Sequence, residues 1–196
     1  ADLPNFNIAQ FQTKGIYCHD DLLYIFGSTH RADSLFINGN FHKSLNESTA
    51  FVLVYNEEMH LVDELYFQLK NDKIKVWLKE VKIDNGDLVL FGSFLLECCE
   101  TKYYMDIGND SIQNILIAED RVDANHNEYI IWWDMKEKKI KKQIPFTHQS
   151  VGFFSINDFD IDANGNVFVA SRDYGGDYKV FGYEAEYERH YDYDAV

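Results

Sequence analysis

The sequence has little of what several protein classes require. Only 3 cysteines and 2 prolines occur in 196 residues, and no apolar run reaches the length of a membrane-spanning helix. An odd number of cysteines that includes the adjacent pair Cys98 and Cys99 does not make a disulfide framework, which favours reduced thiols in a cytoplasmic protein. The chain does not begin with methionine, so a secreted mature chain is the alternative location.

Motifs for catalysis and for metal binding are also absent. The 7 histidines are scattered, neither H-E-x-x-H nor G-x-S-x-G occurs, and Cys98 and Cys99 have no second cluster at zinc-ligand spacing. Residues 158–166 open like a calcium loop, but Ser171 stands where that loop needs a bidentate glutamate, so we interpret the stretch as a strand entering a turn. We expect no cofactor, no metal and no catalytic residue. A triad assembled in space leaves no such signature, so an enzyme remains an alternative.

Positive charge is scarce. The chain has 18 Lys and Arg against 33 Asp and Glu, a formal net charge of −15, which disfavours nucleic acid and anionic membranes as partners because phosphates are repelled. The acidity suits a basic protein partner, and it also serves solubility alone. Residues 136–142 hold five lysines. We expect them to flank a turn on an outer strand, where lysine blocks edge-to-edge pairing.

The sequence is rich in repetition. Residues 81–93 (VKIDNGDLVLFGS) combine a short alternating run, an Asn-Gly hairpin signal and an apolar strand that ends in Gly-Ser. Residues 16–28 and 159–171 align with this stretch on their final serines without a gap. The alignment predicts three equivalent hairpins with their turns at Asp20-Asp21, Asn85-Gly86 and Asn164-Gly165.

A second hairpin repeats in the same way. Residues 50–67 align with residues 129–146 without a gap, and residues 178–184 match the first strand of this pair. Each unit is therefore predicted to have four strands, and Trp132 and Trp133 are expected to face opposite sides of their strand. The units span residues 15–68, 73–146 and 152–196 of a single domain that covers residues 1–196. Residues 111–122 fit neither helix nor strand clearly.

Three stretches carry a resemblance to a known class: INDFDIDANGNVFVASRD (residues 156–173), YKVFGYE (178–184) and YIIWWDM (129–135). They resemble WD40-like blades and the related bacterial propeller repeats, although only one Trp-Asp pair occurs and no Gly-His pair opens a unit. The resemblance implies an all-β, β-propeller-like fold of about three four-stranded antiparallel blades. Closed propellers need about four to eight blades. The units therefore belong to a larger ring, are completed by a second copy, or are covered at their ends.

The connection between the second and third strands varies most among the units. It is long in residues 29–49 and 94–128 and short in residues 172–177. Insertions at one position of a repeat fall on one rim, which is often the binding face. Aromatic and arginine side chains anchor protein interfaces, and the candidate binding residues in these loops are Arg31, Phe36, Phe41, Tyr103 and Tyr104. Alternatively, the loops only cover a blade edge.

Three hypotheses about function follow. The first is a non-catalytic protein-binding module that uses these loops, and its sharper version is an acidic inhibitor or immunity-type protein for a basic partner. The second is a small-ligand-binding or hydrolytic propeller in which Asp84, Asp160 and Asp162 converge on a central channel. The third is a structural subunit of a larger assembly or a homo-oligomer, which the small number of units motivates.

Overall fold

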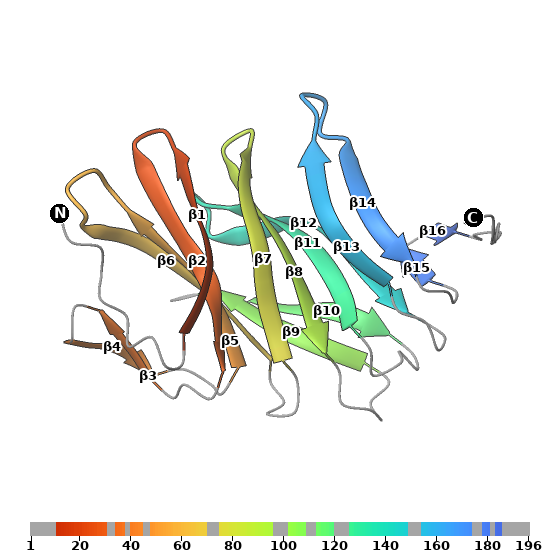
Figure 1. Cartoon of the computed structure of the whole chain (residues 1–196), viewed down its shortest axis with the longest axis horizontal. Coiled ribbons are helices and arrows are strands. Elements are labelled where there is room, and N and C mark those ends of the chain that lie inside the picture. Colours follow the sequence, from red (N-terminus) through yellow and green to blue (C-terminus); the bar gives the residue numbers. More distant parts are fainter. Residues whose placement is uncertain are drawn as a thin grey trace, which may run out of the picture.

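The computed structural model shows an all-β chain of antiparallel strands (Figure 1). The residues it describes are 11–30, 34–37, 40–44, 48–69, 75–95, 102–108, 113–119, 126–148, 154–173, 178–180 and 183–185. Within these ranges no helix is long and apolar enough to span a bilayer.

The first six-stranded sheet holds unit 1 and one added hairpin, in the order β1-β2-β5-β6-β9-β10. Its strands are β1 (Phe11–His19), β2 (Leu22–His30), β5 (Ser48–Tyr55), β6 (Leu61–Leu69), β9 (Lys102–Gly108) and β10 (Gln113–Glu119). Between β2 and β5 the chain forms the separate two-stranded sheet of β3 (Ser34–Ile37) and β4 (Asn40–Ser44). The stretch that fitted neither helix nor strand thus contains β10.

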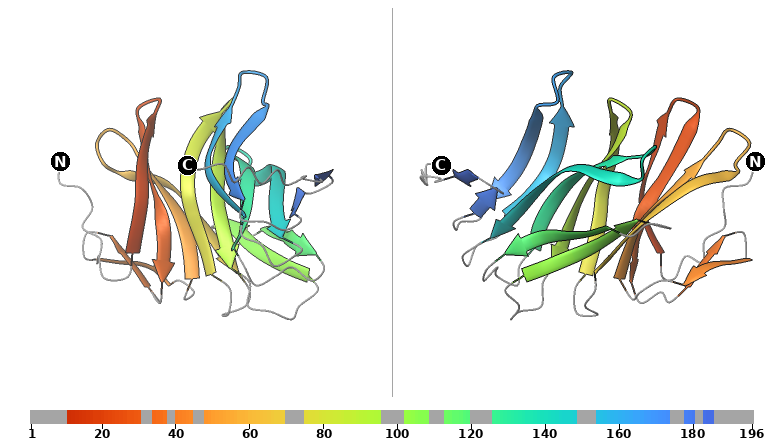
Figure 2. Two further views of the ribbon diagram at one scale, coloured as in Figure 1. Left: turned by 45° about the vertical axis from the view of Figure 1, so that its right-hand side comes forward. Right: turned by 180° about the vertical axis from the view of Figure 1, so that it is seen from behind.

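The second six-stranded sheet holds unit 2 in the order β16-β15-β12-β11-β8-β7. Its strands are β7 (Lys75–Asp84), β8 (Asp87–Leu95), β11 (His126–Asp134), β12 (Lys139–His148), β15 (Tyr178–Val180) and β16 (Tyr183–Ala185). Unit 3 is the two-stranded sheet of β13 (Phe154–Ile161) and β14 (Val167–Asp173). Figure 2 shows the three units side by side. The described strands do not close into a ring.

The hairpin after the second strand of units 2 and 3 pairs with the outer strand of the preceding unit. Strand β9 pairs with β6, with Phe67 opposite Ile107, and β15 pairs with β12, with Phe146 opposite Val180. The prediction that residues 178–184 supply the third strand of unit 3 was wrong. Its apolar pattern suits any partly buried strand, and the open edge of β12 takes it, because an unpaired edge strand favours pairing.

The core lies between the units, and unit 2 is buried on both sides. Toward unit 1 it contributes Leu88, Leu90 and Trp133, and toward unit 3 it contributes Phe91 and Trp132. Successive side chains of a strand point to opposite faces, so the continuous apolar sequence of β8 fits a strand between two neighbours. The prediction that Trp132 and Trp133 face opposite sides is confirmed.

All three first hairpins share one backbone irregularity. Lys14, Lys79 and Asn157 are equivalent in the gap-free alignment, and each is the extra residue of a β-bulge in the first strand of its unit. A bulge bends the strand and re-aims the side chains that follow it. The repetition of this detail supports the equivalence of β1, β7 and β13.

The turn of the third hairpin differs from the other two. Asp20-Asp21 and Asn85-Gly86 form two-residue turns in which all four residues have positive φ, as a type I′ turn requires. In unit 3, however, Ile161 lies opposite Val167, so the loop has five residues, and only Gly165 has positive φ. The prediction of one common turn was therefore wrong for unit 3.

The longer loop shifts the register of β14 by one residue. Val81 lies opposite Leu90 in unit 2, whereas its equivalent Phe159 lies opposite Val169 rather than opposite Phe168. A slip of one residue moves each side chain to the other face of a strand. As a result, Val167 and Val169 pack toward unit 2, and Phe168 points away from it.

Candidate binding surface

The face of unit 3 that is turned away from unit 2 is open to solvent. Asp160 lies opposite Phe168 and Asp158 lies opposite Ala170, and all four residues are exposed. Phe168 has 60% of its surface accessible, the highest value among the exposed large hydrophobic residues of the described part. We call these four residues the end face. It places an aromatic side chain beside two carboxylates, and Figure 1 shows its hairpin, β13–β14, toward the right-hand end of the molecule, with β15 and β16 farther to the right.

The opposite face of the hairpin is fixed to unit 2 by aromatic and lysine contacts. The rings of Phe159 and Phe91 pack with centroids 5.3 Å apart, and Lys82 Nζ lies 4.6 Å from the centre of the Phe159 ring. The same ammonium group donates to the Phe159 carbonyl oxygen and lies 3.4 Å from Asp160 Oδ1. These contacts hold β13 in place and so set the direction of the end face.

A buried carboxylate joins the start of β13 to unit 2. Glu128 on β11 is 1% exposed; its Oε2 accepts a hydrogen bond from the Ile156 backbone N–H at 2.6 Å, and its Oε1 pairs with Lys79 Nζ. Burial raises the pKa of Glu128, while Lys79 and the Ile156 N–H act in the opposite direction. The equivalent N–H in unit 2, that of Leu78, donates to Ser28 Oγ of unit 1 at 3.0 Å. Side chains of each unit thus anchor the first strand of the next.

The five-residue loop between β13 and β14 is organised by Asp162. Its Oδ1 accepts the N–H groups of Asn164 at 2.8 Å and Asn166 at 2.9 Å, and its Oδ2 accepts the Asn166 side-chain amide at 2.8 Å. Both carboxylate oxygens therefore serve the turn, which confirms that this stretch is a strand entering a turn. Among the described residues no three acidic, histidine or cysteine side chains gather as a metal site needs.

The pH dependence of this loop is testable. Hydrogen bonds from Asn166 and Asn164 lower the pKa of Asp162 below 3.8, so the ionised carboxylate favours the folded loop. This contribution is fully present above pH 3.8 and is lost as the pH falls through the lower pKa of the folded state. We expect the amide protons of Asn164 and Asn166 to lose protection only in that acidic range, as measured by NMR. The same amide protons in the variant Asp162→Asn should lose no protection over this pH range. An equal loss in the wild type and in the variant would contradict the role of the Asp162 carboxylate.

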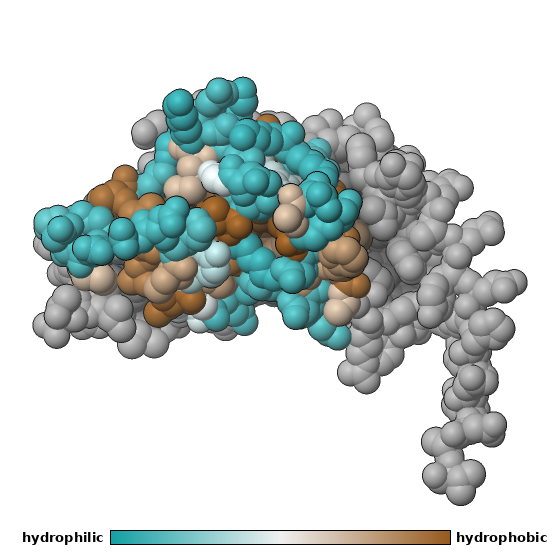
Figure 3. Space-filling model, turned by 90° about the horizontal axis from the view of Figure 1, so that it is seen from above, coloured by the Kyte–Doolittle hydropathy of each residue, from teal (hydrophilic) through white to brown (hydrophobic). Residues whose placement is uncertain are grey.

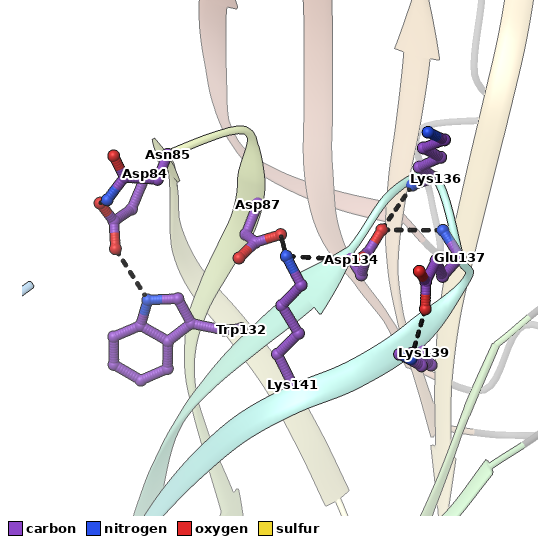
Figure 4. A network of polar contacts seen from close by, with 9 residues as sticks. All are labelled: Asp84, Asn85, Asp87, Trp132, Asp134, Lys136, Glu137, Lys139 and Lys141. Atoms are coloured by element: carbon purple, nitrogen blue, oxygen red, sulfur yellow. Dashed lines mark hydrogen bonds and ion pairs between the residues drawn. The ribbon is translucent and has the colours of Figure 1, made fainter.

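The hairpin turns of unit 2 carry a network of polar contacts (Figure 4). Asp134 Oδ1 accepts the N–H groups of Lys136 and Glu137 at 2.9 and 2.7 Å, and these bonds, that of Glu137 first, together with Lys141 lower the pKa of Asp134. Lys141 Nζ lies 2.7 Å from Asp87 Oδ1 and 3.2 Å from Asp134 Oδ2, which raises the pKa of Lys141. The network joins the β7–β8 turn to the β11–β12 turn.

The lysines of residues 136–142 flank the β11–β12 turn and are exposed, as predicted. Strand β12 is not the edge of its sheet, however, because β15 pairs with its last residues. Lys138 pairs with Asp63 of unit 1, and Lys142 Nζ lies 4.6 Å from the centre of the Trp132 ring. Seen from above, the part of the surface that the described residues form is mainly hydrophilic, with hydrophobic residues visible between the polar ones (Figure 3).

The three carboxylates proposed for a central channel each have local partners. Asp84 Oδ2 accepts the Trp132 indole N–H at 3.1 Å (Figure 4), Asp160 is near Lys82, and Asp162 holds its own loop. Each of the three carboxylates thus has a partner among the described residues.

Four of the five binding residues proposed from the sequence lie on described strands, two on the hairpin β3–β4 and two on β9. Arg31 lies outside the described residues, and Phe36 of β3 is opposite Phe41 of β4. Tyr103 and Tyr104 lie on β9, just before the residues that pair with β6. The pairing of β9 with β6 fits the alternative role of residues 94–128, which was to cover a blade edge. Binding by the five residues stays a prediction. Sequence reasoning missed the end face because its direction depends on the register of β14.

The chain matches no protein-family model, and comparisons with curated proteins and with solved structures find no match either.

Proposed function

We propose that this protein is a non-catalytic protein-binding module whose binding surface is the end face. The observation that carries the proposal is the exposure of Phe168. Phe168 lies opposite Asp160, which aligns with Tyr17 in unit 1 and Lys82 in unit 2. The residues opposite those two, Tyr24 and Val89, are 2% and 0% exposed because the next unit covers them. A bound partner would cover Phe168 as a following unit covers its equivalents, and aromatic anchors of this kind carry much of the energy of an interface.

Charge indicates the chemistry of the partner. The Ile161 N–H and Lys82 lower the pKa of Asp160 below its ordinary range, so its carboxylate is ionised near neutral pH. Asp158 lies beside it on the same face, and the whole chain carries a formal net charge of −15. A basic partner therefore fits best, because complementary charge speeds encounter and selects the partner. An acidic inhibitor or immunity-type protein is the sharper version of this function.

An uncharged polar substitution at Phe168 tests the proposal. We expect Phe168→Ser to weaken capture of a basic partner by the immobilised full-length chain about 30-fold, the loss typical of an interface anchor. The matched control is Val62→Ser, because Val62 is 53% exposed but lies on β6 of unit 1, whereas the end face lies on unit 3. Both variants should keep the wild-type unfolding midpoint, since exposed substitutions change stability by about 0.5 kcal/mol or less.

The comparison is made with the partners captured from the native lysate at low and at high salt. Salt-sensitive capture by the wild type and by Val62→Ser, and its loss in Phe168→Ser, is the expected result. Equal capture by all three chains, or no salt-sensitive partner at all, would overturn the proposal.

A further inference from the structure

We infer that the partner donates a basic β-hairpin, one strand of which pairs antiparallel with the free edge of β14. This inference rests on the proposed function and specifies how the end face is used. It concerns the backbone of β14 as well as the side chain of Phe168.

The repeat shows what occupies this edge in the other units. Strand β2 pairs with β5, with Ser28 opposite Ala50, and β8 pairs with β11, with Ser93 opposite Glu128. Both added strands are antiparallel and belong to a hairpin, β5–β6 or β11–β12. In the described part of the chain, β14 pairs with β13 alone. The equivalent edge therefore offers unpaired backbone groups, which favour the addition of a strand from another chain.

The same fold already completes sheets with hairpins that come from elsewhere in the sequence. Strand β9 of the hairpin β9–β10 adds to β6, and β15 of the hairpin β15–β16 adds to β12. In both cases the receiving strand is the edge of its unit until the hairpin arrives. Strand addition at an edge is thus a recurrent mode of association in this molecule, and β14 has the edge for one more.

Charge selects between the two kinds of hairpin that the chain itself contains. Residues 129–146, which include β11 and most of β12, hold five lysines and two acidic residues, whereas residues 50–67 hold four acidic residues and neither lysine nor arginine. The end face has carboxylates at Asp158 and Asp160, and lysine already lies over an aromatic ring elsewhere in the molecule, as Lys142 lies over Trp132 at 4.6 Å. A hairpin of the first kind therefore suits the end face, with its lysines near the two carboxylates and near the Phe168 ring.

Two synthetic peptides test the inference, because both are natural occupants of this position in the repeat. The peptide of residues 129–146 is expected to bind the full-length chain, and the peptide of residues 50–67 should bind at least about tenfold more weakly. Hydrogen exchange should show new protection in residues 167–173 of β14 when the first peptide is bound. Raising the salt concentration and the substitution Phe168→Ser should both weaken this binding, and Val62→Ser should leave it unchanged.

Different failures are distinguishable. Binding of the basic peptide without protection of β14, or with changed protection at β8, would overturn strand addition at this edge and leave the proposed function standing. Protection of β14 in the free chain would also overturn the inference. If this protection depends on protein concentration, and light scattering detects a dimer, a second copy occupies the edge. If it does not, the chain covers its own edge. If neither the basic peptide nor any basic partner binds, both the inference and the proposed function fail.

Discussion

A chain carrying Gly92→Ala is expected to be less stable than the wild type by about 3 kcal/mol, the upper end of what an overpacked core costs. A Cβ atom at Gly92 would lie 2.2 Å from the Trp77 carbonyl oxygen and 2.3 Å from the Tyr129 hydroxyl oxygen. Neither can move easily, because Tyr129 is 1% exposed and its hydroxyl donates to that same carbonyl at 3.1 Å. Chemical denaturation at unchanged m-value measures the loss.

Gly86→Ala is the matched control for this prediction. Gly86 has a φ of 82° in the β7–β8 turn, but a Cβ atom there would meet nothing within 4 Å. Its cost is limited to the left-handed backbone, about 1 kcal/mol. A loss at Gly92 no larger than the loss at Gly86 would show that the contact between Gly92 and the Tyr129 ring is not a packing constraint.

The second large effect is expected for Glu128→Ala, which should cost about 3 kcal/mol. The substitution leaves the buried Ile156 N–H without its acceptor and the Lys79 ammonium without its carboxylate. Hydrogen exchange should therefore increase first at the start of β13, because this hairpin loses its anchor on unit 2. Glu128→Gln keeps an acceptor for the N–H and should cost about 1 kcal/mol. Equal losses in the two variants would argue against the hydrogen bond as the anchor.

Stability should also respond to pH through this residue. Because burial raises the pKa of Glu128 above 4.5, the folded chain binds this proton more tightly than the unfolded chain does. Its contribution to stability therefore decreases as the pH rises from 4.5 through the raised pKa. The chain with Glu128→Gln should lack this decrease, which parallel denaturation series of the two chains at several pH values would reveal.

The units and their hairpins were predictable from the sequence because their signals are local. The Asn85-Gly86 turn demands positive φ at two adjacent residues, and the apolar run of residues 88–91 fits a strand buried on both faces. Gap-free repetition then extended these assignments to β1 and β2. The partners of β9 and β15 were not predictable, since an apolar strand pattern does not say which distant edge it meets.

The end face was not predicted because the side chain of Asp162 changes the length of the β13–β14 loop. Asn164-Gly165 reads as a two-residue turn, but Asp162 competes for the same backbone groups and closes a five-residue loop. This choice shifts β14 and turns Phe168 outward. The Asp162-x-Asn164 spacing carries that signal, because aspartate favours turns in which it accepts the N–H two residues later.

The pairing of β9 with β6 and of β15 with β12 has a consequence for how the chain is made. During synthesis β6 emerges from the ribosome well before residues 105–108, with which it later pairs. Strand β12 likewise emerges well before its later partner, residues 178–180. During translation each of these strands is an open edge until the later segment emerges, and nascent chains with open edges associate easily. The exposed lysines of the β11–β12 hairpin precede the residues of β12 that β15 later covers, and lysine on an open edge strand disfavours pairing with another chain.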